Sequence, residues 1–277
     1  MSPSPFVTRF APSPTGYLHR GHAYSALTAF KAARDAGGRF LLRIEDIDTQ
    51  RCRPDFEAAI YEDLAWLDLR WETPVRRQSE HFDDYRHALS RLEEQGVIYR
   101  CFKTRAQVLD EIGRAPHGAM SAYRGAPLAP SEEARLITEG LPYAWRLSLA
   151  EAERRLGGFS RLTFHDDDAG LVVARPELAG DVILARKDVG VAYHLAVVVD
   201  DALQGVSHVI RGADLLEATH IQRLLQALLG LPTPAYRHHP LLLGPEGKRF
   251  AKRDRAETLR DLRARGVRRE TLLAELM

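Results

Sequence analysis

The sequence of 277 residues has few cysteines and no long apolar run. Cys52 and Cys101 are its only thiols, and no stretch reaches the roughly 20 apolar residues that a membrane-spanning helix needs. The N-terminal residues MSPSPFVTR lack the basic region and apolar stretch of an export signal. These absences argue against a disulfide scaffold and a membrane protein. We therefore expect a cytoplasmic protein with two reduced thiols.

An excess of charge of one sign is also missing, because 39 Lys and Arg stand against 38 Asp and Glu, a net charge of +1. The net charge therefore does not indicate a class of binding partner. The distribution is more informative, since residues 248–269 contain ten Lys or Arg and three acidic residues. Such a basic segment suits phosphate or RNA, and an exposed arginine-rich helix face is the alternative.

What is present is an alternation of strand-like and helix-like segments over the first 100 residues. The pattern predicts strands 6–10, 39–44 and 97–102, and helices 22–35, 54–67 and 79–95. This order favours an α/β fold built on a parallel sheet. Phosphate ligands in such sheets bind at the carboxyl ends of strands, beside helix N-termini. Residues 10–22 and 45–48 occupy such positions.

The middle of the chain differs in composition. Gly and Pro are concentrated in residues 113–142, and short alternating runs follow. We interpret residues 101–185 as an inserted, loop-rich α+β subdomain. The Rossmann-like core then comprises residues 1–100 and 186–247, and residues 248–277 form a loop and short C-terminal helices.

The second half of the core carries a regular α/β pattern again. Residues 195–201, LAVVVDD, are typical of a buried strand because β-branched apolar residues dominate the run. The remaining predicted elements are strand 209–211, helix 214–229, strand 239–243, and helices 255–265 and 267–277.

The first functional signal is the sequence His19-Arg-Gly-His22, where a predicted strand gives way to a helix. A helix N-terminus offers unpaired N–H groups and a partial positive charge. Imidazoles three residues apart reach the same side of that turn, and Gly21 leaves room for a flat ligand. The pattern predicts a triphosphate site in which both histidines stabilise charge at the α-phosphate. Two surface histidines that cap a helix are the alternative.

The context of this turn resembles class I aminoacyl-tRNA synthetases of the glutamyl type. The matching blocks occur in the family's order: TRFAPSPTGYLHRGH (8–22), LRIEDIDTQR (42–51), YHLAVVVDD (193–201), HVIRGADLL (208–216) and PLLLGPEGKRFAKRD (240–254). The resemblance implies a Rossmann-like catalytic core that binds ATP. It also implies that Lys252 acts with His19 and His22 in catalysis, and with these and Gly21 in binding ATP. The family usually has Lys-Leu-Ser-Lys where this chain has Arg249-Phe-Ala-Lys252.

The resemblance also places the amino-acid site. A dicarboxylic amino acid needs cations for two carboxylates and an acceptor for its ammonium, and arginine binds carboxylates in a fork. Arg9 and Arg211 match the family's carboxylate ligands, Glu45 the ammonium acceptor, and Ser13 and Tyr193 the hydroxyl contacts. Two arginines favour glutamate over glutamine.

The length of the chain points to the acceptor. Only 23 residues follow Asp254, which leaves no room for the helical region with which full-length glutamyl-tRNA synthetases read the anticodon. The chain therefore resembles the glutamyl-queuosine tRNA(Asp) synthetases. That resemblance implies activation of L-glutamate by ATP, with Mg²⁺ on the phosphates, without tRNA. It further implies glutamyl transfer to queuosine in the anticodon stem-loop of tRNA(Asp), by a monomer without membrane contact.

The inserted subdomain of this family often binds zinc through Cys-x-Cys and Tyr-x-x-x-Cys. Here the sequence is Cys101-Phe-Lys103 and Tyr123-Arg-Gly-Ala-Pro127, so Lys103 and Pro127 replace two cysteines. A structural zinc site needs about four ligands. We therefore expect no zinc and no resident metal.

Three alternatives remain open at this stage. The first is a glutamate-activating, adenylate-forming enzyme with an acceptor other than tRNA. The second is a nucleotidyltransferase, because the His-x-Gly-His turn also occurs there. The third is an RNA-binding protein without catalytic activity, which the altered lysine loop suggests.

Overall fold

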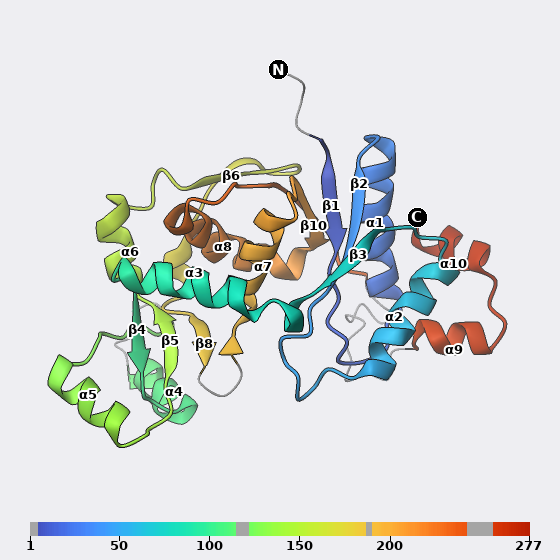
Figure 1. The fold of residues 1–277 in the computed structure, drawn as a ribbon. Helices are drawn as coiled ribbons and strands as arrows, with labels where there is room; N and C mark the ends of the chain where they lie inside the picture. Colours follow the sequence, from blue (N-terminus) through green and yellow to red (C-terminus); the bar gives the residue numbers. More distant parts are fainter. Residues whose placement is uncertain (1–4, 115–121, 187–189, 243–256) are drawn as a thin grey trace.

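The computed structural model describes residues 5–114, 122–186, 190–242 and 257–277, and its elements are arranged as an α/β core with an antiparallel extension (Figure 1). The first layer of the core is a parallel sheet in the order β1–β2–β3. Its strands are β1 (Val7–Phe10), β2 (Arg39–Ile44) and β3 (Glu72–Arg77). The first two pair from Val7 with Arg39 to Phe10 with Leu42. This layer confirms the predicted parallel sheet.

Two helices connect the strands of this sheet, as predicted. They are α1 (Arg20–Asp35) and α2 (Pro54–Trp66). Pro54 stands at the first helical position, where the missing N–H is harmless. The strand β3 was not predicted, because its sequence ETPVRR is mostly polar and contains a proline. Proline is tolerated there because β3 is an edge strand of the sheet.

A second sheet continues the core in the order β10–β11–β6–β7. Its strands are β10 (His208–Gly212), β11 (Ala235–His239), β6 (Thr163–Asp166) and β7 (Gly170–Val173), and helix α8 (Leu216–Leu229) connects the first two. Ser207 joins this sheet to the first, since its N–H donates to the carbonyl of Val7 and its Oγ accepts from the N–H of Val7. Figure 1 accordingly shows β1 beside β10. The last strand ends at His239 and therefore lies earlier than predicted.

Helix α7 (Tyr193–Leu203) corrects the prediction of a strand at residues 195–201. Residues Leu195 to Asp201 are all buried, because α7 packs between α3 and α8 (Figure 1). A helix that is buried on every side is apolar on every side and shows no helical period. The length of the segment, 11 residues, is the feature that distinguishes it from a strand.

The third sheet is antiparallel, in the order β4–β5–β8–β9. It consists of β4 (Ile98–Cys101), β5 (Ala144–Leu147), β8 (Ile183–Arg186) and β9 (Gly190–Val191). Strand β4 pairs with β5 and not with the parallel sheet of the core. The helices around it are α3 (Phe82–Glu94), α4 (Arg105–Arg114), α5 (Pro130–Thr138) and α6 (Leu149–Leu156). The last three were not predicted individually. The division of the chain into core and inserted subdomain stays a prediction.

The C-terminal segment forms two short helices, α9 (Leu259–Ala264) and α10 (Arg269–Leu276), within the ranges predicted for them. Leu259, Leu262 and Leu272 of these helices are buried against α1 and α2 as part of the first layer. No helix within the described ranges is long and apolar enough to cross a membrane.

Candidate active site

The turn at residues 19–22 forms the start of α1, with His19 as the N-cap residue. His19 Nδ1 accepts a hydrogen bond from the N–H of Gly21 at 3.1 Å, and His22 Nδ1 accepts one from the N–H of His19 at 3.2 Å. The two ring centroids lie 3.8 Å apart. The predicted juxtaposition of the two imidazoles is therefore confirmed.

These two hydrogen bonds indicate the tautomer of each ring in its neutral form. A nitrogen that accepts a hydrogen bond carries no proton, so each neutral imidazole carries its proton on Nε2. The backbone thus orients both histidines as Nε2–H donors. Such donors, beside the N-terminal end of a helix, are suited to stabilise negative charge that develops on a phosphate.

Gly21 leaves room for the ring of His19, two residues before it. A Cβ atom at this position would lie 3.0 Å from Cε1 and 3.2 Å from Nδ1 of His19. A larger residue would therefore press on the imidazole ring of His19 and shift it slightly. This intramolecular reason for the glycine adds to the predicted close approach of a ligand.

The C-terminal helices are attached directly to the same turn. His19 forms an isolated antiparallel bridge with Thr258, and the N–H of Leu259 donates to the carbonyl of Leu18 at 2.8 Å. Arg20, the second residue of the quartet, donates to Glu275 of α10. Arg20 therefore connects the turn to the C-terminal helices.

The arginines of this C-terminal region contact the protein itself. Within the described part of residues 248–269 the contacts are Arg260 with Tyr17, Arg263 with Asp63, Arg265 with Glu257, and Arg269 with Asp68. Arg260, Arg263 and Arg269 connect the C-terminal segment to the core, whereas Arg265 pairs within that segment. These four arginines therefore make internal contacts, and a role of the basic segment in binding phosphate or RNA stays a prediction.

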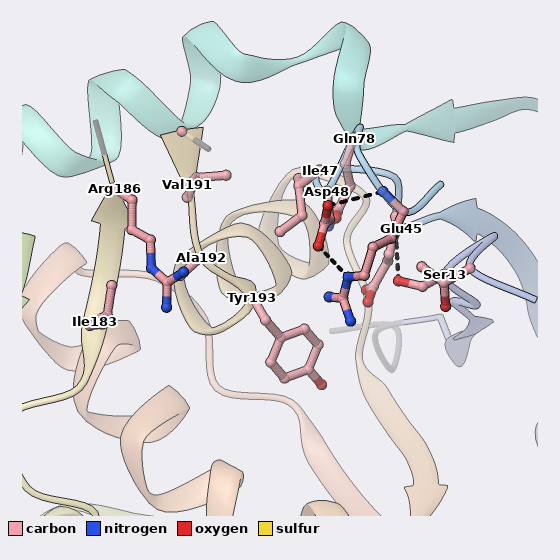
Figure 2. Close-up of a pocket in the computed structure, with 13 residues that line it drawn as sticks. Ser13, Glu45, Ile47, Asp48, Gln78, Ile183, Arg186, Val191, Ala192 and Tyr193 are labelled. Carbon is pink, nitrogen blue, oxygen red and sulfur yellow. Dashed lines mark hydrogen bonds and ion pairs between the residues drawn. The ribbon is translucent and has the colours of Figure 1, made fainter. Parts of the chain in front are cut away.

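A cavity of about 250 Å³ lies at the carboxyl ends of β1 and β2 (Figure 2). Three predicted residues line it: Ser13, Glu45 and Tyr193. The Oγ of Ser13 donates to the carbonyl of Glu45 at 2.6 Å, so it joins the two segments that follow these strands. Gln78 and Arg186 also line this cavity and were not predicted.

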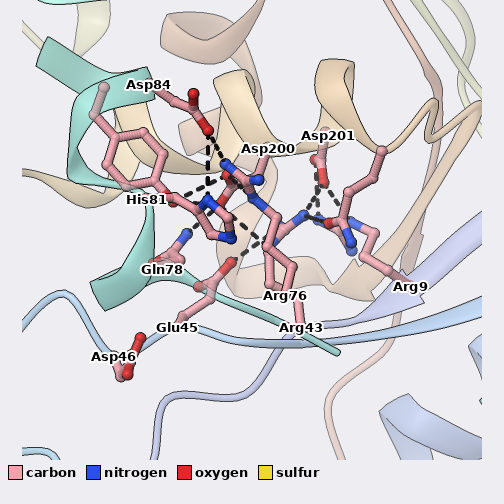
Figure 3. Close-up of polar contacts among 12 residues, drawn as sticks. Arg9, Arg43, Glu45, Asp46, Arg76, Gln78, His81, Asp84, Asp200 and Asp201 are labelled. Atoms are coloured by element: carbon pink, nitrogen blue, oxygen red, sulfur yellow. Dashed lines mark hydrogen bonds and ion pairs between the residues drawn. The ribbon is translucent and has the colours of Figure 1, made fainter. Parts of the chain in front are cut away.

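Behind the cavity lies a buried ion cluster centred on Arg43, whose side chain is 0% exposed (Figure 3). Its guanidinium donates to Asp201 at 2.8 Å, to Gln204 at 2.9 Å and to Glu45 at 3.1 Å. Arg9 pairs with the same Asp201, with Nε at 3.0 Å from Oδ1. The carboxylates of Glu45 and Asp201 thus already have cationic partners within the protein.

Asp200 extends this cluster to a second set of donors. It accepts hydrogen bonds from Arg76 at 2.7 Å, from Gln78 at 2.7 Å and from the hydroxyl of Tyr85 at 2.9 Å (Figure 3). Arg76 also contacts Asp84. The cluster therefore ties β2, β3 and α3 to helix α7.

The two carboxyl groups of the cluster have their pKa values shifted in opposite directions. Burial raises the pKa of Glu45, which Arg43 and Arg9 oppose without cancelling. Burial also acts to raise the pKa of Asp201, but Arg9 and Arg43 together hold it below its ordinary value. For Arg43, burial acts to lower the pKa, but the carboxylates of Asp201, Glu45 and Asp200 outweigh this effect. The pKa of Arg43 is therefore raised above its ordinary value, and the guanidinium stays charged.

Arg211 is buried but has a different environment. Its guanidinium contacts Thr219 Oγ1 at 2.7 Å, Tyr193 Oη at 3.3 Å and His238 Nε2 at 3.4 Å. His238 in turn donates through Nδ1 to Asp166 at 2.7 Å. Among the described residues Arg211 has no carboxylate partner. A buried cation of this kind is costly unless an anion approaches it.

Two further predictions concern the rest of the predicted site. Lys252, like Arg249, lies outside the described residues, so its role stays a prediction.

The second concerns the position where related proteins often bind zinc. There Lys103 pairs with Glu111 at 2.6 Å, and Cys101 Sγ lies 3.9 Å from the hydroxyl of Tyr123. No cluster of three or more His, Cys, Asp or Glu within the described ranges has a metal-binding arrangement.

Several residues of the site were missed by the sequence analysis. Arg43, Asp200 and Asp201 lie within the matching blocks but were not predicted as site residues, and neither were His238 and Asp166. A charged residue inside an otherwise apolar segment, as in LLRIE or VVVDD, is the signal that could have identified the first three.

Comparison with known proteins identifies the class. The family described as "tRNA synthetases class I (E and Q), catalytic domain" matches residues 5–277. Because the match extends over nearly the whole sequence, the chain belongs to this family. This confirms the family predicted from the five sequence blocks.

Individual relatives are similar over most of the chain. A Glutamyl-Q tRNA(Asp) synthetase from Rhodobacter capsulatus is 46% identical over 276 residues, which cover 94% of this chain and 96% of the relative. A protein of the same name from Symbiobacterium thermophilum is 44% identical and matches 97% of this chain and 84% of its own length. A Glutamate–tRNA ligase from Aquifex aeolicus is 38% identical, but the match covers 55% of the ligase.

Solved structures agree with this assignment. The glutamate-tRNA synthetase of Elizabethkingia anophelis has a TM-score of 0.77 and 31% sequence identity, over 90% of this chain and 53% of that protein. A glutamate tRNA ligase of Elizabethkingia meningosepticum, solved in complex with its amino acid, has a TM-score of 0.75 over 52% of its chain. The chain thus spans about half the length of these structures, and the Rossmann-like fold is confirmed.

The ion cluster predicts that two arginines of β2, Arg43 and Arg39, differ greatly in their contribution to the free energy of unfolding. Arg43→Met leaves Asp200 and Asp201 without their central cation, so we expect a loss of about 3–5 kcal/mol in the free energy of unfolding. The control Arg39→Ala removes an exposed partner of Glu72 and should cost less than about 1 kcal/mol. Urea unfolding monitored by circular dichroism measures both. Similar losses for both variants would contradict a central role for Arg43.

The half-buried His194 predicts a loss of stability in acid. Burial, with a smaller contribution from Arg211, lowers the pKa of His194 to about 4. The unfolded state therefore binds a proton more readily than the folded state, and stability declines as the pH falls from about 6.5 towards 4. We expect His194→Gln to reduce this slope by up to about 1.4 kcal/mol per pH unit. The exposed His165→Gln is the control, and equal slopes in urea titrations of both variants would refute the prediction.

Proposed function

We propose that the chain activates L-glutamate with ATP and transfers the glutamyl group to queuosine in the anticodon loop of tRNA(Asp). The observation that carries the choice of glutamate is Arg211, a buried guanidinium with no carboxylate partner among the described residues, next to Tyr193 of the cavity. A substrate carboxylate would supply the missing anion. A neutral amide, as in glutamine, would not.

The remaining contacts of glutamate follow from the same cavity. Glu45 lines it and is the acceptor that we propose for the substrate ammonium. The hydroxyl of Tyr193 lies between Arg211 and the cavity and is oriented by that arginine. Arg9 is our second candidate for a carboxylate contact. Because Arg9 is already paired with Asp201, we expect it to contribute less than Arg211.

Activation joins the substrate carboxylate to ATP, which enters as its Mg²⁺ complex. An oxygen of the glutamate α-carboxylate attacks the α-phosphorus, the bond to pyrophosphate breaks, and glutamyl adenylate forms. The Nε2–H groups of His19 and His22 donate to phosphate oxygens as negative charge develops. We assign neutralisation of the leaving pyrophosphate to Lys252. Gly21 keeps the ring of His19 in place.

Transfer completes the reaction. A hydroxyl of the queuosine cyclopentene diol attacks the carbonyl carbon of glutamyl adenylate, the new ester bond forms, and AMP leaves. Holding the hydroxyl against the adenylate contributes much of the rate, because positioning makes the step effectively intramolecular. The relatives of similar length are named Glutamyl-Q tRNA(Asp) synthetase, which supports this acceptor. These names do not favour the alternative of an acceptor that is not a tRNA.

We further propose that the enzyme works in the cytoplasm as a monomer and without zinc. The zinc proposal depends on Lys103 and Pro127, which replace two family cysteines. A chain that retains Cys101 and Tyr123 alone is short of the about four ligands that a structural zinc ion needs.

The proposed activity predicts glutamate-dependent exchange of pyrophosphate into ATP in the absence of RNA. With RNA present, radiolabelled glutamate should appear on tRNA(Asp) from cells that make queuosine and not on the same tRNA from cells that lack it. Exchange without glutamate would instead indicate a nucleotidyltransferase. Absence of exchange under all conditions would refute the proposal.

The proposed role of Arg211 predicts that its replacement weakens the binding of glutamate much more than the binding of ATP. We expect Arg211→Ala to raise the KM for glutamate about 100-fold, because a charge-assisted bidentate contact is lost, and to change the KM for ATP less than about threefold. Tyr193→Phe, which removes the hydroxyl at 3.3 Å from Arg211, should have a smaller effect on the same constant. The exchange assay measures both constants. Equal effects of Arg211→Ala on both substrates would show that Arg211 does not bind glutamate.

A further inference from the structure

A second cavity, of about 210 Å³, lies between helix α3 and the antiparallel sheet. The helix contributes Phe82, Tyr85, Arg86 and Leu89, whose spacing places them on one face. From the sheet, Tyr143 and Trp145 of the β5 segment complete a largely aromatic wall. The cavity is smaller than the roughly 300–1,000 Å³ typical of drug-sized ligands. It therefore suits one planar ring system.

The aromatic side chains of the sheet are held in place by the protein. Tyr143 and Trp145 contact each other edge to face, with ring centroids 5.9 Å apart. The guanidinium of Arg100 stacks 4.1 Å from the centroid of Trp145 and 5.5 Å from that of Tyr143. Arg100 is itself fixed by Glu93 and Glu133, at 2.9 and 2.5 Å. The wall thus exists before any ligand arrives, which lowers the entropic cost of binding.

This aromatic cavity lies next to the cavity proposed for glutamate. Arg186, Gly190 and Val191 line both. Figure 2 shows Arg186 and Val191 on the side of the first cavity opposite Ser13 and Glu45. A ring bound between α3 and the sheet would therefore lie beside the site proposed for the activated carboxyl group.

The charges around the aromatic cavity suit a polyanion. Arg86 and Arg186 both line it. Arg86 is paired with Asp83 at the surface, whereas Arg186 makes no side-chain hydrogen bond or ion pair with any residue that the structure describes. The described arginines of the C-terminal helices, by contrast, are engaged in internal contacts. Arg186 is therefore a described cation at this cavity that is available to an anionic ligand.

We propose that the aromatic cavity binds the base of queuosine, with the base stacked on Tyr143 and Trp145 and the diol extending past Val191 to the glutamyl adenylate. The inference rests on the proposed function and adds the place where the acceptor is recognised. Aromatic stacking with nearby cations is a common way to hold a base that has left its own stack. Arg86 and Arg186 contact the phosphates of the anticodon loop.

The test uses the full chain, a synthetic anticodon stem-loop of tRNA(Asp) with queuosine, and the free queuosine nucleoside as a competitor. We expect Tyr143→Ala to raise the KM for the stem-loop about tenfold and to weaken inhibition by the nucleoside by a similar factor. Tyr143→Phe, which keeps the ring, should restore both values. Glutamate-dependent pyrophosphate exchange should be unchanged in both variants, because activation does not use this cavity.

Two further variants serve as comparisons. Arg86→Ala alters an exposed side chain, so folding is not in question, and it should raise the KM for the stem-loop about threefold with a weaker salt dependence. Leu171→Ala, which removes an exposed leucine of β7 in another sheet, should change nothing.

The outcomes separate this inference from the proposed function. If the unaltered chain shows no transfer to queuosine, the proposed function fails. If it shows transfer but Tyr143→Ala leaves the stem-loop KM within about twofold, the aromatic cavity is not the acceptor site. If the stem-loop KM rises while inhibition by the nucleoside is unchanged, the cavity holds another part of the RNA and the assignment to queuosine is overturned.

Discussion

The buried guanidinium of Arg43 is the interaction on which the catalytic core depends. It lies near the carboxyl end of β2 and reaches Asp200 and Asp201 in the C-terminal half of α7, so it connects two parts of the core that are more than 150 residues apart in sequence. A charge in such a place is stable only when its partners are held around it. The same guanidinium donates to Glu45, which lines the cavity. Arg43 thus both connects β2 to α7 and holds a side chain that lines the cavity.

This cluster also explains why the arginines of the site are not equivalent. Arg9 and Arg43 share Asp201, whereas Arg211 contacts only neutral groups within the described part of the chain. Two of these buried cations therefore have carboxylate partners within the protein, and the third is the one that we propose for the substrate carboxylate. Asp166 and His238 support this third arginine from behind, because His238 donates to Asp166 and presents its other ring nitrogen to Arg211.

Prediction from the sequence succeeded where local pattern and structure coincide. The strand at 39–44 and the helix that begins at Pro54 were predicted at their observed starts, since turns and proline mark them. Prediction failed for α7, whose β-branched run imitates a strand because the helix is buried on every side. It also failed for β3, which is too polar to be recognised alone. Both elements depend on neighbours that are distant in sequence.

The sequence by itself determined the α/β class, the family and the order of the functional blocks, because these follow from local patterns and motifs. It also placed His19 and His22 together, since three residues span one helical turn. Only the tertiary structure decided which arginine lacks an internal carboxylate, which basic residues dock the C-terminal helices, and which aromatic residues of α3 and β5 face one cavity. These properties depend on distances between segments far apart in the chain, and burial makes each such distance decisive for charge.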